Sequence, residues 1–161
     1  MSRIRVALLG ASGSIGLQAA DVIAQHPDEF ELVALASGRG GDQHNALASA
    51  NPKARSLLAG SADDLRSLVL DTAPDIALIA TTGVIGLAPT VAALEAGVAV
   101  AIANKETIVA GGDVVMRAAR AAAERKGSDV LERLRPVDSE HSALWQCLAG
   151  ESLDRVRALW L

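Results

Sequence analysis

The stretch GASGSIG, residues 10–16, follows a short apolar run at residues 4–9 and opens a segment whose apolar residues have helical spacing. Glycines at three-residue intervals in a strand-to-helix turn let the backbone approach a diphosphate and direct helix N–H groups toward it. The form is G-x-x-G-x-x-G rather than G-x-G-x-x-G, and the same glycines also suit a plain tight turn. The stretch therefore indicates a dinucleotide as the first ligand to consider.

The composition favours an α/β protein. With 161 residues the chain is long enough for one ordinary domain with a substantial core. Half of the residues are hydrophobic, mostly Ala, Val, Leu and Ile, and the aromatic residues are Phe30, Trp145 and Trp160. Such an aliphatic composition is typical of buried parallel sheets.

Charge and cysteine content exclude several classes of protein. The net charge is −4 and Lys and Arg form no block, which argues against a nucleic-acid partner. The single cysteine, Cys147, excludes an internal disulfide framework and is expected as a small core residue on a helix. There is no signal-peptide pattern, and no apolar run reaches about 18 residues. We therefore expect a cytoplasmic protein with no membrane partner.

The periodicity of apolar residues predicts strands and helices that alternate along the chain. At least five consecutive strand–helix steps predict a doubly wound, Rossmann-like, mostly parallel sheet with helices on both faces. The first helix is expected to bury Ile15, Ala19, Val22 and Ile23. The predicted strands are residues 3–9, 31–36, 56–59, 75–80, 98–103, 130–137 and a start at 155. The predicted helices are residues 14–25, 42–50, one that follows capping groups at 61–64 and ends near 71, 89–96, 113–125 and one ending at 148.

Ligands of doubly wound sheets bind at the carboxyl ends of the strands. The turns that contain Gly10, Gly38, Thr81 and Asn104 all follow predicted strands, so the site is expected at this edge.

The loop SGRGG, residues 37–41, indicates which dinucleotide binds. Roughly 20 residues after the glycine motif, NAD-binding folds usually place an acid for the ribose 2′-hydroxyl. Here Arg39 stands between Gly38 and Gly40 instead, and a cation among open amides suits a 2′-phosphate. The loop therefore predicts NADPH, although a solvated loop charge is the alternative. His26 and His44 lie in polar contexts and are expected to be ordinary surface residues.

Three different polar residues, Asn104, Lys105 and Glu106, close the fifth predicted strand. An amide can orient a ring, a cation can hold an oxyanion and a carboxylate can accept a hydrogen bond. These residues indicate a site, and a capped turn with solvated charges is the alternative.

Asp138, Ser139 and Glu140 lie where the sixth predicted strand meets a helix. Two carboxylates beside a hydroxyl offer hard oxygen ligands to Mg²⁺ or Mn²⁺. The same acids could instead interact with the helix dipole. His141 is equally open to interpretation as a ligand, a base or an ordinary helix residue.

Three segments together resemble the 1-deoxy-D-xylulose 5-phosphate reductoisomerase family: GASGSIG at 10–16, ANKETIV at 103–109 and PVDSEHSA at 136–143. They occur in the family's order, and the last two are specific to it. The resemblance covers essentially the whole chain. It implies an NADPH-binding domain at residues 1–130 and the start of a catalytic domain at residues 131–161.

The resemblance also implies roles for individual residues. Lys105 matches a substrate contact, Asp138 and Glu140 match two ligands of the divalent metal, and Ser139 and Glu140 also contact the substrate. The positions that match NADPH contacts are Gly10, Ser12, Gly13, Ser14 and Ile15 for the diphosphate, Gly38, Arg39 and Gly40 for the 2′-phosphate, and Asn104 and Glu106.

The reaction implied by the resemblance is the metal-dependent isomerisation and NADPH-dependent reduction of 1-deoxy-D-xylulose 5-phosphate to 2-C-methyl-D-erythritol 4-phosphate, toward isoprenoids, in a homodimer. The chain ends at Leu161, before the family's third metal ligand and its phosphate-binding groups, so we expect NADPH binding with little or no turnover. The segment at residues 117–135 is several residues longer than is usual in the family that the chain resembles. The alternatives are a non-catalytic NADP-binding module and another NADP-dependent dehydrogenase of the same fold.

Overall fold

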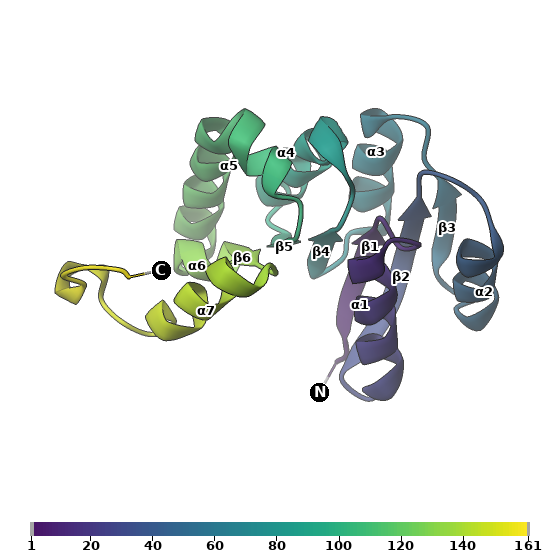
Figure 1. Cartoon of the computed structure of the whole chain (residues 1–161), viewed down its shortest axis with the longest axis horizontal. Coiled ribbons are helices and arrows are strands. Elements are labelled where there is room, and N and C mark those ends of the chain that lie inside the picture. The colour runs from purple at the N-terminus through teal and green to yellow at the C-terminus, as the bar shows by residue number, and fades with distance from the viewer. Residues whose placement is uncertain (1, 161) are drawn as a thin grey trace.

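The computed structural model describes residues 2–160 and has a six-stranded sheet in the order β3-β2-β1-β4-β5-β6 (Figure 1). Every strand pair is parallel. The chain order reverses direction at β1, so the sheet is wound outward on both sides and the predicted fold class is confirmed. The strands are β1 (Ile4–Leu9), β2 (Phe30–Ser37), β3 (Arg55–Leu58), β4 (Ile76–Ile79), β5 (Ala99–Ile102) and β6 (Leu134–Pro136).

Helices connect successive strands, as parallel pairing requires. The helices are α1 (Ser14–Gln25), α2 (Asp42–Ala50), α3 (Ala62–Thr72), α4 (Leu87–Glu95), α5 (Lys105–Lys126), α6 (Val130–Arg133) and α7 (Ser139–Leu148), with the short 3₁₀ helices η1 (Gly83–Gly86) and η2 (Leu153–Arg155). Of these, α7 and η2 follow the last strand.

The two faces of the sheet are covered by different helices (Figure 1). Alternate side chains of β1 point to opposite faces. Leu8 packs in a cluster with Ala20 of α1 and Leu47 of α2. Leu9 packs in a larger cluster with residues of α3, α4 and α5, among them Leu68. Both layers are aliphatic, as the composition predicts.

The buried face of α1 differs from the predicted one. Ile15 and Val22 are 40% and 51% exposed, whereas Gly16 and Ala20 are buried. A Cβ on Gly16 would lie 2.3 Å from the Gly10 carbonyl oxygen, so the helix approaches the turn too closely for a larger side chain. Small residues therefore face inward, and the prediction for Ile15 and Val22 is wrong.

The helix α5 begins earlier than predicted. It starts at Lys105 and bends at Gly111, whose φ of −141° is not helical. A Cβ on Gly111 would lie 2.5 Å from Leu87 Cδ1, so the bend occurs where α5 passes closest to α4. The bend divides α5 into a short first part, residues 105–110, which follows β5 at the carboxyl edge of the sheet, and a longer second part, residues 112–126.

The predicted strand at residues 130–137 is mostly wrong. The Asp129 side chain accepts a hydrogen bond of 2.7 Å from the Leu131 N–H and starts the one-turn helix α6, which leaves only Leu134–Pro136 as strand β6. A capping side chain therefore favours a helical turn over β-propensity here.

The C-terminal part of the described chain is thinly packed. Neither α6 nor α7 has a buried residue. Cys147 is exposed, so its prediction as a core residue is wrong. The strand predicted from residue 155 is also wrong, because residues 156–160 have no neighbouring strand with which to pair and form no regular secondary structure.

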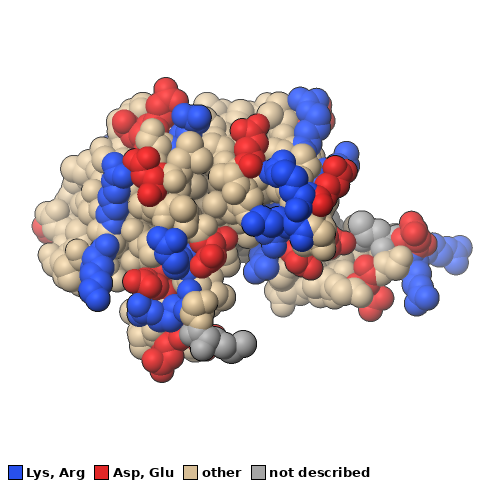
Figure 2. Space-filling model, turned by 180° about the vertical axis from the view of Figure 1, so that it is seen from behind, with Lys and Arg blue, Asp and Glu red and all other residues tan. Residues whose placement is uncertain are grey.

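On the face of the molecule seen in Figure 2, acidic and basic side chains alternate over the surface. Within residues 2–160, every helix is too short or too polar to span a bilayer.

Candidate functional site

The glycine-rich turn begins at Gly10, directly after β1. Gly10 has a φ of +94°, and a Cβ there would lie 2.3 Å from the Ala80 carbonyl oxygen. The N–H groups of Gly10 and Ala11 both donate to the Ala36 carbonyl, at 2.9 and 2.8 Å. The turn is thus fixed between the ends of β2 and β4, and only glycine fits at its first position.

The helix α1 leaves its N-terminus open. Its N-cap, Gly13, makes no side-chain cap hydrogen bond, and Gly13, Ser14 and Ile15 are exposed. The first N–H groups of a helix have no intrahelical partner and carry partial positive charge. This end of α1 therefore has the geometry that binds a phosphate or diphosphate.

A pocket of about 400 Å³ brings the predicted 2′-phosphate loop next to this turn. It is lined by Ser12 and by residues 39–44, which include Arg39. Arg39 is exposed, and within the described chain it has no salt-bridge partner. The N-cap of α2, Gly41, also lacks a side-chain cap. A cation and a second uncapped helix start therefore lie at the same pocket.

His44 lies at this pocket but is not the surface residue that its sequence context predicts. It is 6% exposed; its Nδ1 lies 3.0 Å from Ser37 Oγ and its Nε2 lies 3.0 Å from Ser56 Oγ. Burial is possible because both ring nitrogens have hydroxyl partners. His26 is exposed as predicted and pairs with Glu29 at 3.4 Å.

Asn104 is the N-cap of α5 and is almost fully buried. Its Nδ2 donates to Thr81 Oγ1 at 3.1 Å and to the Gly83 carbonyl at 2.7 Å, and its Oδ1 accepts from the Thr107 N–H at 3.0 Å. The amide therefore joins the turns that follow β4 and β5. Lys105 and Glu106 come next and are exposed.

Asp138 is the N-cap of α7. Its carboxylate accepts a hydrogen bond of 3.1 Å from the His141 N–H and also contacts His141 Nδ1. Partial burial acts to raise the pKa of Asp138, but the bonds from His141 and the charges of His141 and Lys105 lower it overall. Asp138 is thus ionised at neutral pH at the start of α7, where a negative charge also interacts favourably with the helix dipole, as the alternative to a metal ligand predicts.

Glu140 projects from the first turn of α7 and is exposed. The Ser139 hydroxyl donates to Glu140 Oε2 at 2.7 Å, and this bond is the main cause of a lowered pKa for Glu140. Lys105 also lowers it. Glu140 therefore offers an ionised carboxylate beside a hydroxyl.

Lys105 connects the two predicted groups of substrate and metal residues. Its charge acts on both Asp138 and Glu140. Lys105, Asp138 and His141 also line one pocket of about 430 Å³, which is otherwise mostly apolar. Within residues 2–160, no three His, Cys, Asp or Glu side chains converge as a metal site. Asp138 and Glu140 can supply only part of a coordination shell.

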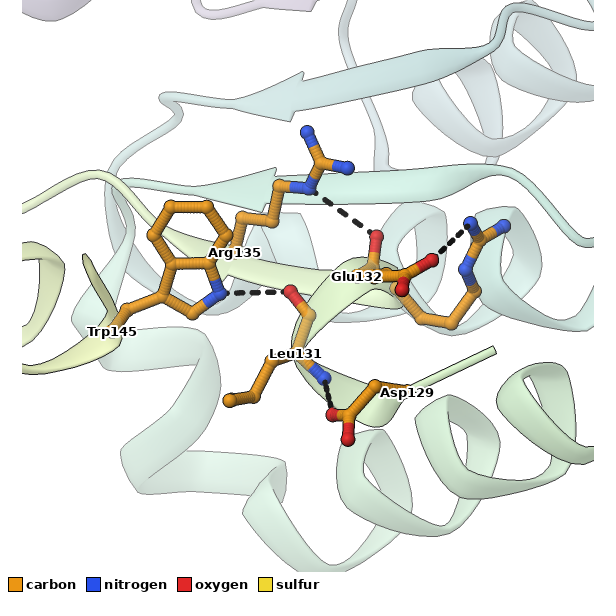
Figure 3. A network of polar contacts seen from close by, with 6 residues as sticks. Asp129, Leu131, Glu132, Arg135 and Trp145 are labelled. Carbon is orange, nitrogen blue, oxygen red and sulfur yellow. Dashed lines mark hydrogen bonds and ion pairs between the residues drawn. The ribbon is translucent and has the colours of Figure 1, made fainter. Parts of the chain in front are cut away.

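Trp145 holds α7 in place, a role that sequence reasoning missed (Figure 3). Its Nε1 donates to the Leu131 carbonyl of α6 at 2.8 Å, and the Arg135 guanidinium lies 5.9 Å from the centre of its ring. Within the described chain, this hydrogen bond is the only one from an α7 side chain to another helix. The segment before Asp138 therefore supports α7 through Leu131 and Arg135. The sequence signal that could have indicated this role is a tryptophan in a helix that begins with acidic residues.

The fold and the polar groups at the carboxyl edge of the sheet define a doubly wound α/β domain of the Rossmann type, with an open helix start after β1 and carboxylates after β6. The model of the 1-deoxy-D-xylulose 5-phosphate reductoisomerase family matches residues 6–54 and 41–112. The chain belongs to this family, and the resemblance noted from its motifs is confirmed.

Curated relatives match nearly the whole chain. The 1-deoxy-D-xylulose 5-phosphate reductoisomerase of Geobacillus sp. (strain WCH70) is 41% identical over 97% of this chain and 44% of its own length. That of Nocardia farcinica (strain IFM 10152) is 44% identical over 98% of this chain and 41% of its own length. The chain thus spans about two fifths of the length of these relatives.

Solved structures agree with the fold. The reductoisomerase from Zymomonas mobilis in complex with NADPH superposes with a TM-score of 0.77 at 28% identity, over 91% of this chain and 41% of its own. A DOX-P reductoisomerase in complex with NADPH, fosmidomycin and magnesium gives a TM-score of 0.71 at 29% identity, over 89% and 38%. The WlbA dehydrogenase from Bordetella pertussis, at 23% identity, shares the fold alone, with a TM-score of 0.64 over 91% and 41%.

Proposed function

We propose that this chain is the NADPH-binding and substrate-contacting part of an enzyme that isomerises and reduces 1-deoxy-D-xylulose 5-phosphate to 2-C-methyl-D-erythritol 4-phosphate. The observation that carries the proposal is that Lys105, after β5, and Asp138, after β6, line one pocket at the same sheet edge as the glycine turn. Solved structures of similar reductoisomerases in complex with NADPH, magnesium and fosmidomycin support it.

The cofactor assignment rests on the glycine turn and the loop after β2. The open start of α1 fits the diphosphate, and Arg39 fits a 2′-phosphate across the pocket from Ser12. In this proposal the cofactor contacts are Gly10, Ser12, Gly13, Ser14, Ile15, Gly38, Arg39, Gly40, Asn104 and Glu106.

The metal and substrate assignments rest on α7 and the start of α5. Asp138 and Glu140 offer the ionised oxygen ligands that Mg²⁺ and Mn²⁺ prefer. Lys105 is positioned to hold an anionic oxygen, and the Ser139 hydroxyl can donate to the substrate. Bound NADPH supplies a hydride, and a bound divalent cation supplies a Lewis acid for substrate oxygens.

The 161-residue chain alone is expected to perform only part of this function. Two carboxylates leave a metal shell incomplete, so we expect NADPH binding with little turnover of substrate. Residues 131–161 are proposed as the start of the catalytic domain that follows residues 1–130. A homodimer and a cytoplasmic location are further parts of the proposal, based on the family resemblance.

A titration with Mn²⁺ tests the metal assignment. In the presence of NADPH, we expect the double variant Asp138→Asn/Glu140→Gln to bind Mn²⁺ at least about tenfold more weakly than the wild type, because charged ligands are lost. The matched control is Asp63→Asn/Glu124→Gln, which removes two exposed acids elsewhere, and it should bind as the wild type does.

A second candidate function is a non-catalytic NADP-binding module, favoured by the capping role of Asp138 in α7. Under that function, Mn²⁺ binding is the same in the wild type and in both double variants. Equal Mn²⁺ binding would therefore contradict the metal assignment and favour the non-catalytic NADP-binding module.

A further inference from the structure

Three side chains that are far apart in the sequence form a buried hydrogen-bonded group, which we call the His44 triad: Ser37, His44 and Ser56. Ser37 is the last residue of β2, His44 lies in the first turn of α2, and Ser56 lies on β3. His44 bonds both serines at 3.0 Å, and Ser37 is 1% exposed. Neither the glycine turn nor the metal residues take part in the triad.

The Ser37–His44 hydrogen bond joins the two ends of the loop at residues 38–41. Backbone bonds hold each end separately, from the Ala59 N–H to the Ser37 carbonyl and from the Asn45 N–H to the Gly41 carbonyl. Residues 38–41 follow Ser37 directly, and three of these four residues are glycine, which has the greatest backbone freedom to lose. A Cβ added at Gly38 or Gly41 would meet no atom within 4 Å, so neighbouring groups do not confine the loop at these positions. The bond at the base of the loop is therefore a main restraint on its path.

Arg39 lies in this loop, and its guanidinium can reach a 2′-phosphate only if the loop holds it on the Ser12 side of the pocket. Arg39, His44 and Ser12 all line that pocket. We propose that His44 is a positioning residue that, through Ser37, fixes the loop and so determines the preference for NADPH over NADH. This inference rests on the proposed NADPH site and adds to it a specificity determinant outside the ligand contacts.

A purely structural histidine has a different consequence. If the triad only filled the space between α2 and the sheet, its loss would weaken the binding of both cofactors to the same extent. A positioning role instead predicts a selective loss for the cofactor that carries the 2′-phosphate.

The experiment is a calorimetric titration of NADPH and of NADH into the 161-residue chain and its variants. In His44→Asn the amide lies near the position of Nδ1 and can keep the bond to Ser37, whereas in His44→Gln it lies near Nε2 and keeps the bond to Ser56. We expect His44→Gln and Ser37→Ala, each of which loses the hydrogen bond between residues 37 and 44, to raise the Kd for NADPH roughly five- to tenfold, with less than about a twofold change for NADH. His44→Asn should retain most of the preference, and the control His26→Asn all of it.

An equal loss of affinity for both cofactors, or no loss in Ser37→Ala and His44→Gln, overturns the role of His44. If Arg39→Ala still removes the NADPH preference in that case, the proposed cofactor site stands and only the inference about His44 fails. If the wild type itself does not prefer NADPH, the proposed site and the inference are both overturned.

Discussion

Two regions of the ligand edge are built differently: the β1–α1 turn, in the middle of the sheet, and the β6–α7 junction, at its border. We call them the two ends of the site. At the β1–α1 end, backbone groups in direct contact fix the turn, as Gly10 against Ala80 and Gly16 against Gly10 illustrate. At the β6–α7 end, single side chains do so: Asp138 caps α7, and Trp145 attaches it to α6. The difference indicates that the first end tolerates almost no change in shape, whereas the second can adjust without disturbing the sheet.

The largest expected effect is at Gly10. Gly10→Ala places a Cβ 2.3 Å from the Ala80 oxygen at a φ of +94°. We expect a loss of about 3 kcal/mol or more in the free energy of unfolding, because a clash adds to backbone strain. The matched control is Gly38→Ala, where a Cβ meets nothing within 4 Å and the change should stay within about 0.5 kcal/mol. Urea denaturation measures the free energy of unfolding of both variants. Similar losses in the two variants would show that the close contact at Gly10 does not fix the turn.

The second prediction concerns Trp145, at the other end. Trp145→Ala removes a hydrogen bond and a cation–π contact and should lower the local opening free energy of α7 by about 1–2 kcal/mol. Trp145→Phe keeps an aromatic ring but loses the N–H donor, and it should lower the local opening free energy of α7 by about 1 kcal/mol. Hydrogen exchange of the α7 amides gives these values, while the exchange of β1 should not change. Trp160→Phe, at a highly exposed residue, is the control. Equal changes in β1 and α7 would show that the two ends are coupled.

The sequence predicted some features of the fold and the site and not others. Gly10 was recognisable because the glycine requirement is local to the turn, and the strand ends of β1, β2 and β5 follow from their apolar runs. The burial of His44 was not predictable, because it depends on hydroxyls from two strands that only the tertiary fold brings together.

The same limit applies at the other end of the site. The acids of residues 138–140 were recognisable as a motif, but α6 was not, because the Asp129 cap outweighs a run of residues with strand propensity. The partner of Trp145 is a backbone carbonyl, which no residue pattern specifies. Ile15 and Val22 are exposed because the close approach of α1 admits only small residues inside.

The smallest expected effect is the response to acid. Ser61 is the N-cap of α3 and Asp64 completes its capping box; the pKa of Asp64 is lowered mainly by the Ser61 hydroxyl, and the pKa of Asp138 is lowered overall by His141. Carboxylates with lowered pKa values stabilise the fold fully above their unfolded pKa of about 4 and lose this contribution as the pH falls through the folded value.

Amide exchange should therefore show α7 fraying below about pH 4, while α3 persists because Leu65, Leu68 and Val69 are buried. Asp138→Ala should produce the same fraying at neutral pH. Simultaneous loss of protection in α3 and α7 would contradict the expectation that α7 depends on its cap whereas α3 is held by its buried residues.

The most direct test of the account is the binding of NADPH and NADH to the wild-type chain, Arg39→Ala and a control, Arg66→Ala, on the exposed side of α3. We predict that the wild type and Arg66→Ala bind NADPH at least about tenfold more tightly than NADH, and that Arg39→Ala binds the two equally, because one charged contact to the 2′-phosphate is lost. Equal affinities in the wild type, or a parallel loss of both cofactors in Arg39→Ala, would contradict an NADPH site at this edge of the sheet.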